Sequence, residues 1–387
     1  MRTAITAGAL FTPLGHIENV AVVIEDERLV GVGPRSEVDL GSADVHEFPK
    51  AILAPGYIDL HIHGAANYDL MDCDAAGLFQ LGRFLAKHGV TAYLPTTITA
   101  PIDHMLRALD RLSCAIEEFE TRTHHEPFAM PLGIHLEGPF VSYARRGVHA
   151  AVHILQPSVE LFERFWTASR GRIVMMTIAP EMPEALAVIA EASRRGICVS
   201  IGHTNADYEK GCEAIAAGAR HATHCFNAMR RLEHRDPGVL GAVLADRNVT
   251  ADVIVDGLHV HPPIVDVFLR AKGIDGAVLI SDATSATGMP DGVYRLGSFE
   301  VTVSGLRCES FGKLAGSVLT LDVAVRNVVR FAGLPLADTV RLASYNPARV
   351  LRRESQYGQL RPGAQGDLVV LSPEGEVLRT FIGGRLA

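Results

Sequence analysis

The sequence contains few lysines, few aromatic residues and no cluster of basic residues. Only five of its 387 residues are lysine, aromatic residues make up 6%, and the formal net charge is −8. No run of Lys and Arg interrupts this acidic balance, so nonspecific binding to nucleic acid is not expected. A few local donors would still suffice to bind a phosphorylated metabolite.

Long apolar runs and paired cysteines are also missing. No stretch approaches the roughly 20 apolar residues of a membrane-spanning helix, so no membrane partner is expected. The six cysteines are scattered, without a CxxC pair, and are expected to be reduced thiols. The first residues, MRTAITAGALFTPLGH, do not have the pattern of a signal peptide. These features predict a cytoplasmic location.

Eight short runs rich in β-branched and apolar residues follow one another in the central part of the chain. Helix-like stretches such as 183–196 and 206–219 separate most of them. This alternation is typical of parallel strands with crossover helices. Eight repeats predict an α/β fold, a (β/α)8 TIM barrel, with an open doubly wound sheet as the alternative. The predicted strands are 51–61, 90–97, 131–137, 172–179, 197–203, 221–226, 250–257 and 277–282.

Both ends of the chain have a different pattern. The N-terminal part contains short alternating segments such as 19–33 and no long helix. The C-terminal segment 366–387 has hairpin character around the turn Pro373-Glu374-Gly375. We expect the two ends to combine into a small β-sandwich domain, residues 1–52 and 348–387, beside a barrel formed by residues 53–347.

Polar residues stand at or near the C-terminal ends of five predicted strands. In a (β/α)8 barrel these ends converge on one face, where active sites are built. Residues far apart in the chain would therefore meet in one cavity. The five residues are His61, Glu137, His203, His224 and Asp282.

His61 and His63 form an HxH pair at the end of the first predicted strand. Side chains alternate along a strand with period two, so both imidazoles face the same side. Such a pair suits a borderline divalent cation, although a pair alone is more often structural. Joined to the other strand-end residues, it predicts one or two divalent ions, either Zn2+, the preferred ion, or Fe2+.

The central anion of the predicted metal site is expected to be Glu137. In many binuclear hydrolases a carboxylated lysine at the end of strand four has this role, but here no lysine lies at a predicted strand end on the catalytic face. Glu137 directly follows an apolar strand, although a capping or salt-bridge role is the alternative. Asp282 is either an N-cap or the general base that takes a proton from metal-bound water, and the facing histidines favour the base.

Ten motifs follow one another along the chain: APGYIDLHIHG, HLEGPF, GHTNA, THCFNAM, HRDPG, DGLHV, SDAT, GMPDGVYRLGS, LAGSVLTLDVAVRNVV and SYNPARVL. In this order they resemble the motifs of the N-acetylglucosamine-6-phosphate deacetylases, which belong to the amidohydrolase superfamily. The resemblance covers nearly the whole chain, and the ordered set is more specific than any single piece. It implies a metal-dependent deacetylase that converts N-acetylglucosamine 6-phosphate to glucosamine 6-phosphate and acetate, and a homodimer.

The resemblance also implies roles for individual residues. Asp282 matches the catalytic acid/base, and His149 matches a histidine that contacts the substrate and polarises the acetyl carbonyl. The residues that match metal ligands are Glu137, His203, His224, His61, His63 and Asp282, of which the HxH pair completes a second site in some members.

Four further residues match substrate contacts. Asn227 and Ala228 match positions whose backbone amides face the sugar phosphate. Arg235, which matches an arginine that reaches across a dimer interface, offers a planar fork suited to phosphate. His259 matches another contact. A surface ion pair for Arg235 and a structural role for His259 are the alternatives.

Two loops depart from the family pattern. After His149 the family usually carries Asn or Asp, whereas Ala150 and Ala151 follow here. The loop after HxH is usually glycine-rich, whereas here it reads Gly64-Ala65-Ala66-Asn67-Tyr68. Because both loops are expected to border the substrate pocket, N-acetylgalactosamine 6-phosphate or another N-acyl metabolite remains an alternative substrate. A noncatalytic binding barrel is disfavoured because every predicted ligand and the base are present.

Overall fold

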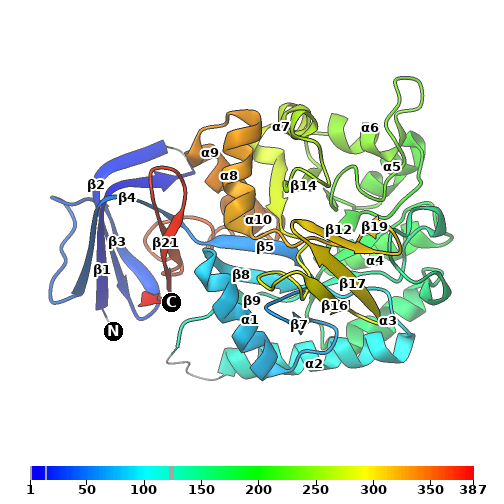
Figure 1. The fold of residues 1–387 in the computed structure, drawn as a ribbon, viewed down its shortest axis with the longest axis horizontal. Coiled ribbons are helices and arrows are strands. Elements are labelled where there is room, and N and C mark those ends of the chain that lie inside the picture. Colours follow the sequence, from blue (N-terminus) through cyan, green and yellow to red (C-terminus); the bar gives the residue numbers. More distant parts are fainter. Residues whose placement is uncertain (1, 14, 122–125) are drawn as a thin grey trace.

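The computed structural model of the chain describes residues 2–13, 15–121 and 126–387. A β-sheet built from both chain ends lies beside a larger α/β unit (Figure 1). Within the described residues, no helix has both the length and the apolar character needed to span a bilayer.

Both chain ends contribute to one seven-stranded sheet with the order β22-β21-β20-β4-β1-β2-β3. Its strands are β1 (Arg2–Thr12), β2 (Gly15–Glu25), β3 (Arg28–Pro34), β4 (Asp44–Pro55), β20 (Leu368–Leu371), β21 (Val377–Ile382) and β22 (Arg385–Leu386). The C-terminal strands join through β20, which pairs antiparallel with the end of β4. A separate apolar core of residues from both ends, including Ile5, Leu53 and Phe381, stabilises this sheet.

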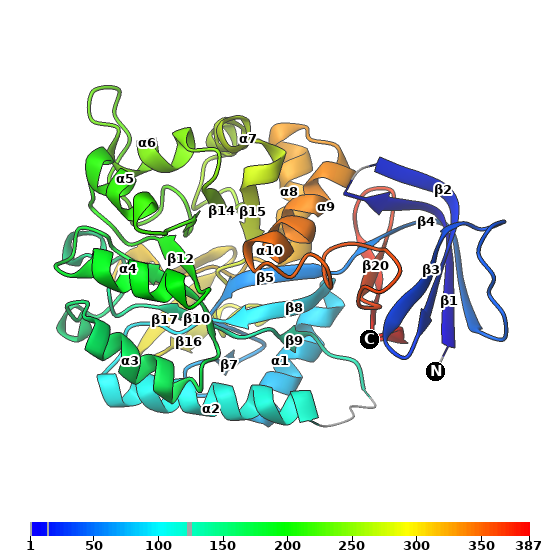
Figure 2. The same cartoon turned by 180° about the vertical axis from the view of Figure 1, so that it is seen from behind.

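Parallel strands form the curled centre of the α/β unit (Figure 2). They are β5 (Tyr57–Ile62), β8 (Val90–Pro95), β9 (Met130–Pro131), β10 (Ile134–Glu137), β11 (Ile173–Ile178), β12 (Cys198–Ile201), β13 (His221–Ala222), β14 (Thr250–Ile254) and β15 (Ala277–Ile280). They form two sheets, β5-β8-β9 and β10-β11-β12-β13-β14-β15. Their order follows the sequence, without the reversal that defines a doubly wound sheet.

Helices follow most of the parallel strands and pack around them (Figures 1 and 2). They are α1 (Ala75–Lys87), α2 (Ile102–Thr121), α3 (Val159–Ala168), α4 (Ala185–Arg194), α5 (Tyr208–Ala216), α6 (Gly238–Ala245), α7 (Pro262–Gly276), α8 (Leu321–Ala332), α9 (Leu336–Ala343) and α10 (Tyr345–Val350). Asp74, Ser158 and Asp207 begin three of them, each accepting a backbone N–H of the first turn, which stabilises these starts. The helices predicted over 183–196 and 206–219 are confirmed as α4 and α5.

The prediction of a single first strand over 51–61 was wrong, because two strands share this segment. The chain leaves the terminal sheet at Pro55 and enters β5 at Tyr57. At Gly56 between them, a Cβ atom would lie only 2.2 Å from Oγ1 of Thr91, so the crossing requires glycine. A continuous apolar run does not distinguish one strand from two that lie in different sheets.

An antiparallel sheet between β15 and α8 was missed by the sequence reasoning. Its strands are β16 (Gly292–Leu296), β17 (Phe299–Ser304), β18 (Arg307–Ser310) and β19 (Lys313–Leu314). β17 buries only alternate residues, as expected for a sheet with one solvated face. Two short antiparallel strands, β6 (Gly64–Ala65) and β7 (Tyr68–Asp69), form the loop after the HxH pair.

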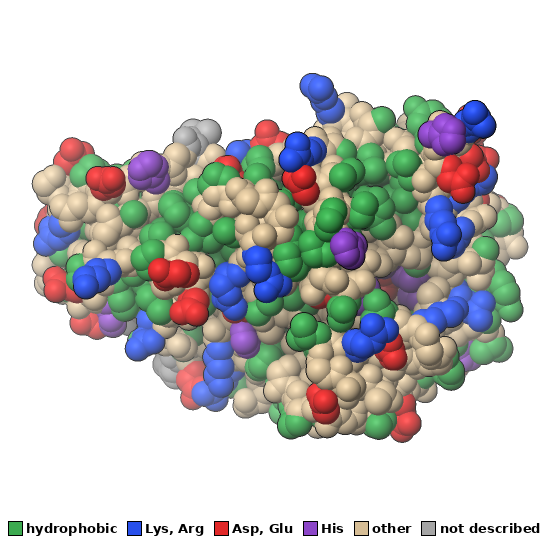
Figure 3. Space-filling view, turned by 45° about the horizontal axis from the view of Figure 1, so that its top comes forward, with side chains coloured by type: hydrophobic (Ala, Val, Ile, Leu, Met, Phe, Trp, Pro, Cys, Tyr) green, Lys and Arg blue, Asp and Glu red, His purple; other side chains and the backbone are tan. Residues whose placement is uncertain are grey.

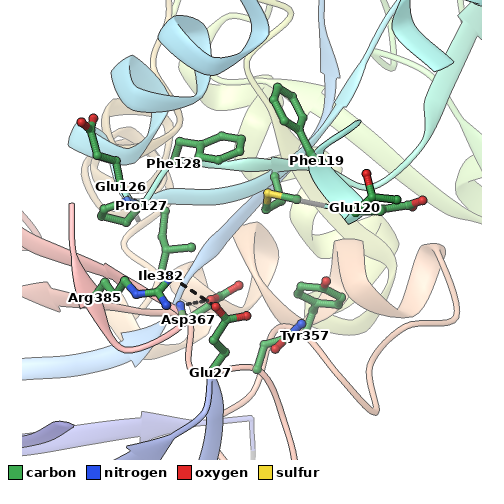
Figure 4. A pocket seen from close by; sticks show the side chains of 14 residues that line it. Glu27, Phe119, Glu120, Glu126, Pro127, Phe128, Tyr357, Asp367, Ile382 and Arg385 are labelled. Carbon is green, nitrogen blue, oxygen red and sulfur yellow. Dashed lines mark hydrogen bonds and ion pairs between the residues drawn. The ribbon is translucent and has the colours of Figure 1, made fainter. Parts of the chain in front are cut away.

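A cavity of about 400 Å3 lies between the terminal sheet and the end of α2 (Figure 4). Asp367 borders it, and one of its carboxylate oxygens accepts the N–H of Gly383 at 2.9 Å. Arg385 pairs with Glu27 at 3.2 Å. Burial, together with the nearby charge of Glu27, raises the pKa of Asp367 to about 7.

This raised pKa predicts an unusual pH dependence of stability. The folded state keeps Asp367 protonated when the unfolded chain has already ionised it, so its contribution to stability falls between about pH 4 and 7. Asp367→Asn should therefore unfold at a higher temperature than the wild type at pH 8, and this advantage should shrink towards pH 4. Thermal unfolding of both proteins at the two pH values tests it; the exposed Asp39→Asn is the control. An equal difference in unfolding temperature between Asp367→Asn and the wild type at both pH values would contradict the prediction.

Candidate metal centre and substrate cavity

The C-terminal ends of the parallel strands bring six buried side chains to one place. β5 carries His61 and is followed by His63, and β10 ends at Glu137. The remaining three each lie two residues beyond a strand, which places them on the same end of the sheet. They are His203 after β12, His224 after β13 and Asp282 after β15.

Glu137 lies at the centre of this cluster. One of its carboxylate oxygens is within 3.2–3.4 Å of Nε2 of three histidines, and the other is 3.3 Å from Nε2 of a fourth and 3.5 Å from Nε2 of a fifth. A single buried carboxylate therefore faces five imidazoles. The first three histidines are His203, His224 and His61, the fourth is His63 and the fifth is His149.

Two groups of ligand atoms can be distinguished in the cluster. One consists of His61, His63 and Asp282, and the other of Glu137, His149 and His203, with the ligand atoms of each group within 4.8 Å of one another. Nε2 of His224 lies 3.0 Å from Nε2 of His203. Imidazole nitrogens and carboxylate oxygens are the donors that zinc and similar divalent ions prefer. The donor set therefore fits one or two such ions.

Two of the histidines are oriented by contacts of the ring. Nδ1 of His63 lies 3.3 Å from the carbonyl oxygen of Thr96, and Nδ1 of His203 lies 3.1 Å from that of Arg145. A carbonyl only accepts, so in both rings Nδ1 carries the proton. Once Nε2 has lost any proton, its lone pair is directed at the cluster, as a metal ligand requires.

His61 and His224 are oriented through their backbones. Within the described residues, Nδ1 of His61 and of His224 is buried without a hydrogen-bond partner. The backbone N–H of His61 donates to the carboxylate of Asp59 at 3.3 Å, and that of His224 donates to Asp252. Both aspartates are almost completely buried. Asp252 also lies 2.9 Å from Nε2 of His221.

Sequence reasoning missed these two supporting aspartates, although a signal was present. Each is an acid inside an apolar strand, in YIDLHI and TADVI, where a carboxylate is retained only with partners. Asp59 also accepts the N–H of Ser281 at 3.3 Å, which links the HxH strand to the one before Asp282.

Three site residues have left-handed backbone conformations. The φ angles are 47° at His203, 32° at His224 and 49° at Asp282. Non-glycine residues rarely adopt this region, and each instance costs free energy that the surroundings must offset. The sharp turns after short strands direct these side chains to a common point.

His149 differs from His63 and His203 in its tautomer. The backbone N–H of Thr99 points to Nδ1 of His149 at 3.3 Å, and Thr99 Oγ1 lies 2.6 Å from the same nitrogen. Nδ1 therefore accepts, and the proton of the neutral ring is on Nε2. Although His149 belongs geometrically to one candidate ligand group, this tautomer makes it a hydrogen-bond donor towards the cavity.

The charges of the cluster are balanced among its own members. Burial opposes ionisation of Glu137, but His61 and His203 outweigh it and hold the pKa of Glu137 well below its usual value. Burial likewise lowers the pKa of His63, but hydrogen bonds to Asp282 and Glu137 outweigh it and raise that pKa to about 10. The carboxylates are thus ionised, as cation ligands must be.

A cavity of about 160 Å3 opens above the cluster. Its further lining includes His259, whose Nδ1 lies 2.7 Å from the carboxylate of Asp256. Asn227 and Ala228 also line it, but the N–H of Asn227 already donates to the carbonyl of His224 at 2.9 Å. The missed sheet contributes Leu296 and Leu314 to the same cavity.

Arg235 is the one predicted site residue that the chain does not bring to the cluster or to its cavity. It is exposed on the loop before α6 and is absent from the lining residues. The alternative for Arg235 was a surface ion pair with Asp236 or Glu233. Among the described residues it forms neither, and Asp236 pairs with Arg230 instead.

Comparison with known proteins agrees with this arrangement. The amidohydrolase family model matches residues 52–387. The chain therefore belongs to the amidohydrolase family, whose members are expected to bind a divalent metal with such ligand groups.

Within that family, the chain is similar to deacetylases of amino sugar phosphates. It is 38% identical to the N-acetylglucosamine-6-phosphate deacetylase of Lysinibacillus sphaericus, covering 96% of this chain and 94% of that protein. It is 34% identical to the N-acetylgalactosamine-6-phosphate deacetylase of Escherichia coli O157:H7 over the full length of both. The structure of the N-acetylglucosamine-6-phosphate deacetylase of Mycobacterium smegmatis superimposes with a TM-score of 0.92 at 33% identity, covering 100% and 99% of the two chains. The resemblance inferred from the motifs is confirmed.

The central position of Glu137 predicts a large effect on metal binding. Glu137→Gln removes the charge that faces the imidazoles, so Zn2+ affinity should fall by more than about 100-fold. Competition with a chromogenic chelator measures the affinity, and the exposed Glu233→Gln is the control. An affinity equal to that of the wild type would remove Glu137 from the ligand set.

Proposed function

We propose that this chain is a metal-dependent deacetylase that hydrolyses the N-acetyl amide of N-acetylglucosamine 6-phosphate to glucosamine 6-phosphate and acetate. The observation that carries the proposal is the buried cluster around Glu137, at the base of a cavity, in a chain 38% identical to an N-acetylglucosamine-6-phosphate deacetylase. Figure 3 shows basic side chains interspersed with acidic and apolar ones, and the displayed face has no continuous basic surface of the kind that nucleic acids require.

The residues divide naturally into two proposed metal positions. Glu137, His203 and His224 would hold one divalent ion, and His61, His63 and Asp282 the second where it is present. Zn2+ is the proposed ion, with Fe2+ as the alternative. Such an ion supplies Lewis-acid polarisation of the amide carbonyl and a lower pKa for water.

Asp282 and His149 are the proposed catalytic residues. Asp282 would accept a proton from the attacking water and return it to the departing amine, because its carboxylate is 3.3 Å from Nε2 of His63 and lines the cavity. His149 would donate its Nε2–H to the carbonyl oxygen, where negative charge develops during attack. The tautomer fixed by Thr99 supports this role.

The phosphate is proposed to bind at the opposite side of the cavity. The N–H of Ala228 and the side-chain amide of Asn227 would supply donors there, and His259, whose Nδ1 is held by Asp256, would contact the sugar. Arg235 would complete the site from the second subunit of a homodimer, which accounts for its exposure in the single chain. The planar guanidinium suits bidentate contact with phosphate.

The finer architecture is also part of the proposal. Parallel bridges between Thr96 and His135, and between Ile62 and Ala283, join the two parallel sheets at both edges, which supports a closed (β/α)8 barrel over residues 53–347. The terminal sheet, with its own core, supports a β-sandwich domain of residues 1–52 and 348–387. A cytoplasmic location is proposed for the enzyme.

The second candidate substrate is N-acetylgalactosamine 6-phosphate. It is supported by the 34% identity to a deacetylase of that sugar and by the altered loops after His63 and His149. Steady-state kinetics with both epimers, with and without the 6-phosphate, decides between them. A higher kcat/KM for the galacto epimer would replace the proposed substrate.

Asp282→Asn should separate catalysis from metal binding. An amide cannot accept the proton of the attacking water, so kcat should fall by about three or more orders of magnitude, with the ion at the Glu137 site retained. Element analysis and kcat are measured on the same sample. Wild-type kcat in this variant would exclude Asp282 as the base.

Arg235→Ala should mainly weaken substrate binding. Loss of a bidentate phosphate contact is expected to raise KM by about tenfold or more, with a smaller effect on kcat. Arg379→Ala, an exposed change in the terminal sheet, is the matched control. An unchanged KM would refute the role of Arg235.

A further inference from the structure

The metal cavity has a neighbour that shares its walls. A second cavity has a volume of about 380 Å3. Its lining residues come from three segments, 146–151, 296–299 and 311–316, that also contribute to the lining of the metal cavity. Gly147, Val148 and His149 line both cavities. The two cavities therefore adjoin along these three residues. They are called here the inner compartment, which contains the metal ligands, and the outer compartment.

The shared residues fix the side on which the outer compartment lies. Asn227, Ala228 and His259, proposed for the phosphate, line only the inner compartment. His149, proposed to face the carbonyl oxygen of the scissile amide, borders both. In the pose proposed above, the outer compartment lies beside His149 on the acyl side of the amide, and the sugar phosphate lies in the inner compartment.

The lining of the outer compartment is basic and apolar. Arg146 and Lys313 line it, and no Asp or Glu is among the described residues that do so. Arg146 stacks over Tyr143 at 5.1 Å, and neither cation forms an ion pair with a described carboxylate. Phe299 and Phe311 contribute aromatic surface, and Phe311 is 82% exposed.

Small side chains complete the wall. Ala150 and Ala151, directly after His149, add only methyl groups. A short hydrocarbon chain can pass along such a wall, while a terminal anion would meet the two cations. In a protein with a net charge of −8, a cavity bordered by unpaired cations and free of acids favours anionic ligands.

We propose that the outer compartment is an acyl subsite, which admits N-acyl groups longer than acetyl that end in a carboxylate, such as succinyl. This inference rests on the proposed deacetylase function. The reaction is the same hydrolysis: the oxygen of water bonds to the acyl carbon, the carbon–nitrogen bond breaks, the amine takes up a proton, and the dicarboxylate is released. Arg146 and Lys313 determine this specificity by binding the distal carboxylate.

The test compares three substrates in the metal-loaded enzyme. They are N-acetyl-, N-butanoyl- and N-succinylglucosamine 6-phosphate, of which the last two have chains of equal length and differ in the terminal charge. The wild type should hydrolyse the succinyl compound with a kcat/KM at least about tenfold above that for the butanoyl compound.

The variants are Arg146→Ala, Lys313→Ala and the double variant. The double variant should lose this preference, with a fall in kcat/KM of about tenfold or more for the succinyl substrate and unchanged values for the acetyl substrate. Lys313→Glu should reduce succinyl hydrolysis further, because the introduced charge repels the carboxylate. Lys50 is exposed in the terminal sheet. Lys50→Ala removes one positive charge far from the outer compartment and is the control.

The other outcomes overturn the proposal in distinguishable ways. Hydrolysis of the acetyl but not the succinyl substrate would refute the acyl subsite and leave the deacetylase function intact. An equal loss for acetyl and succinyl substrates in the double variant would show that the cations only attract the phosphorylated sugar. Failure to hydrolyse any of the three would refute the proposed function and the subsite with it.

Discussion

The rest of the site depends on the buried carboxylate of Glu137. A charge enclosed in protein is stable only when opposite charge or hydrogen-bond donors surround it. Here five imidazoles face it, contributed by loops and strands distributed over much of the chain, and a cation bound among them would supply further opposite charge. The parallel strands satisfy this requirement because their C-terminal ends meet at one side.

The imidazoles are held in two different ways. The rings of His63 and His203 are fixed directly by backbone carbonyls. The rings of His61 and His224 have no such partner among the described residues, and buried aspartates hold their backbones instead. At His224 the hydrogen bond from the backbone to the buried aspartate also stabilises the left-handed backbone conformation of this residue.

Much of the site could be predicted from the sequence, because period-two alternation and the position of polar residues after apolar runs are local signals. The order of residues along the chain is enough to indicate His61, His63 and Glu137. The division between β4 and β5 was not predictable in this way, since a change of sheet depends on a close approach to Thr91 and not on composition.

Other features depend on contacts that no local pattern encodes. The tautomer of His149 follows from Thr99, which lies 50 residues earlier in the chain. The sheet β16–β19 was missed because its short strands alternate with turns and resemble a loop. Arg235 is exposed outside the cavity of the single chain, and its place in the motif HRDPG does not reveal this position.

The pairing of β4 with β20 has a consequence for the synthesis of the protein. The strand β4 leaves the ribosome long before β20, so the edge of β4 that accepts β20 has no partner until the residues of β20 have emerged. Unpaired strand edges are prone to association with other chains. The nascent chain must therefore carry this exposed edge through the translation of every intervening element, and the terminal sheet closes only after β20 has been made.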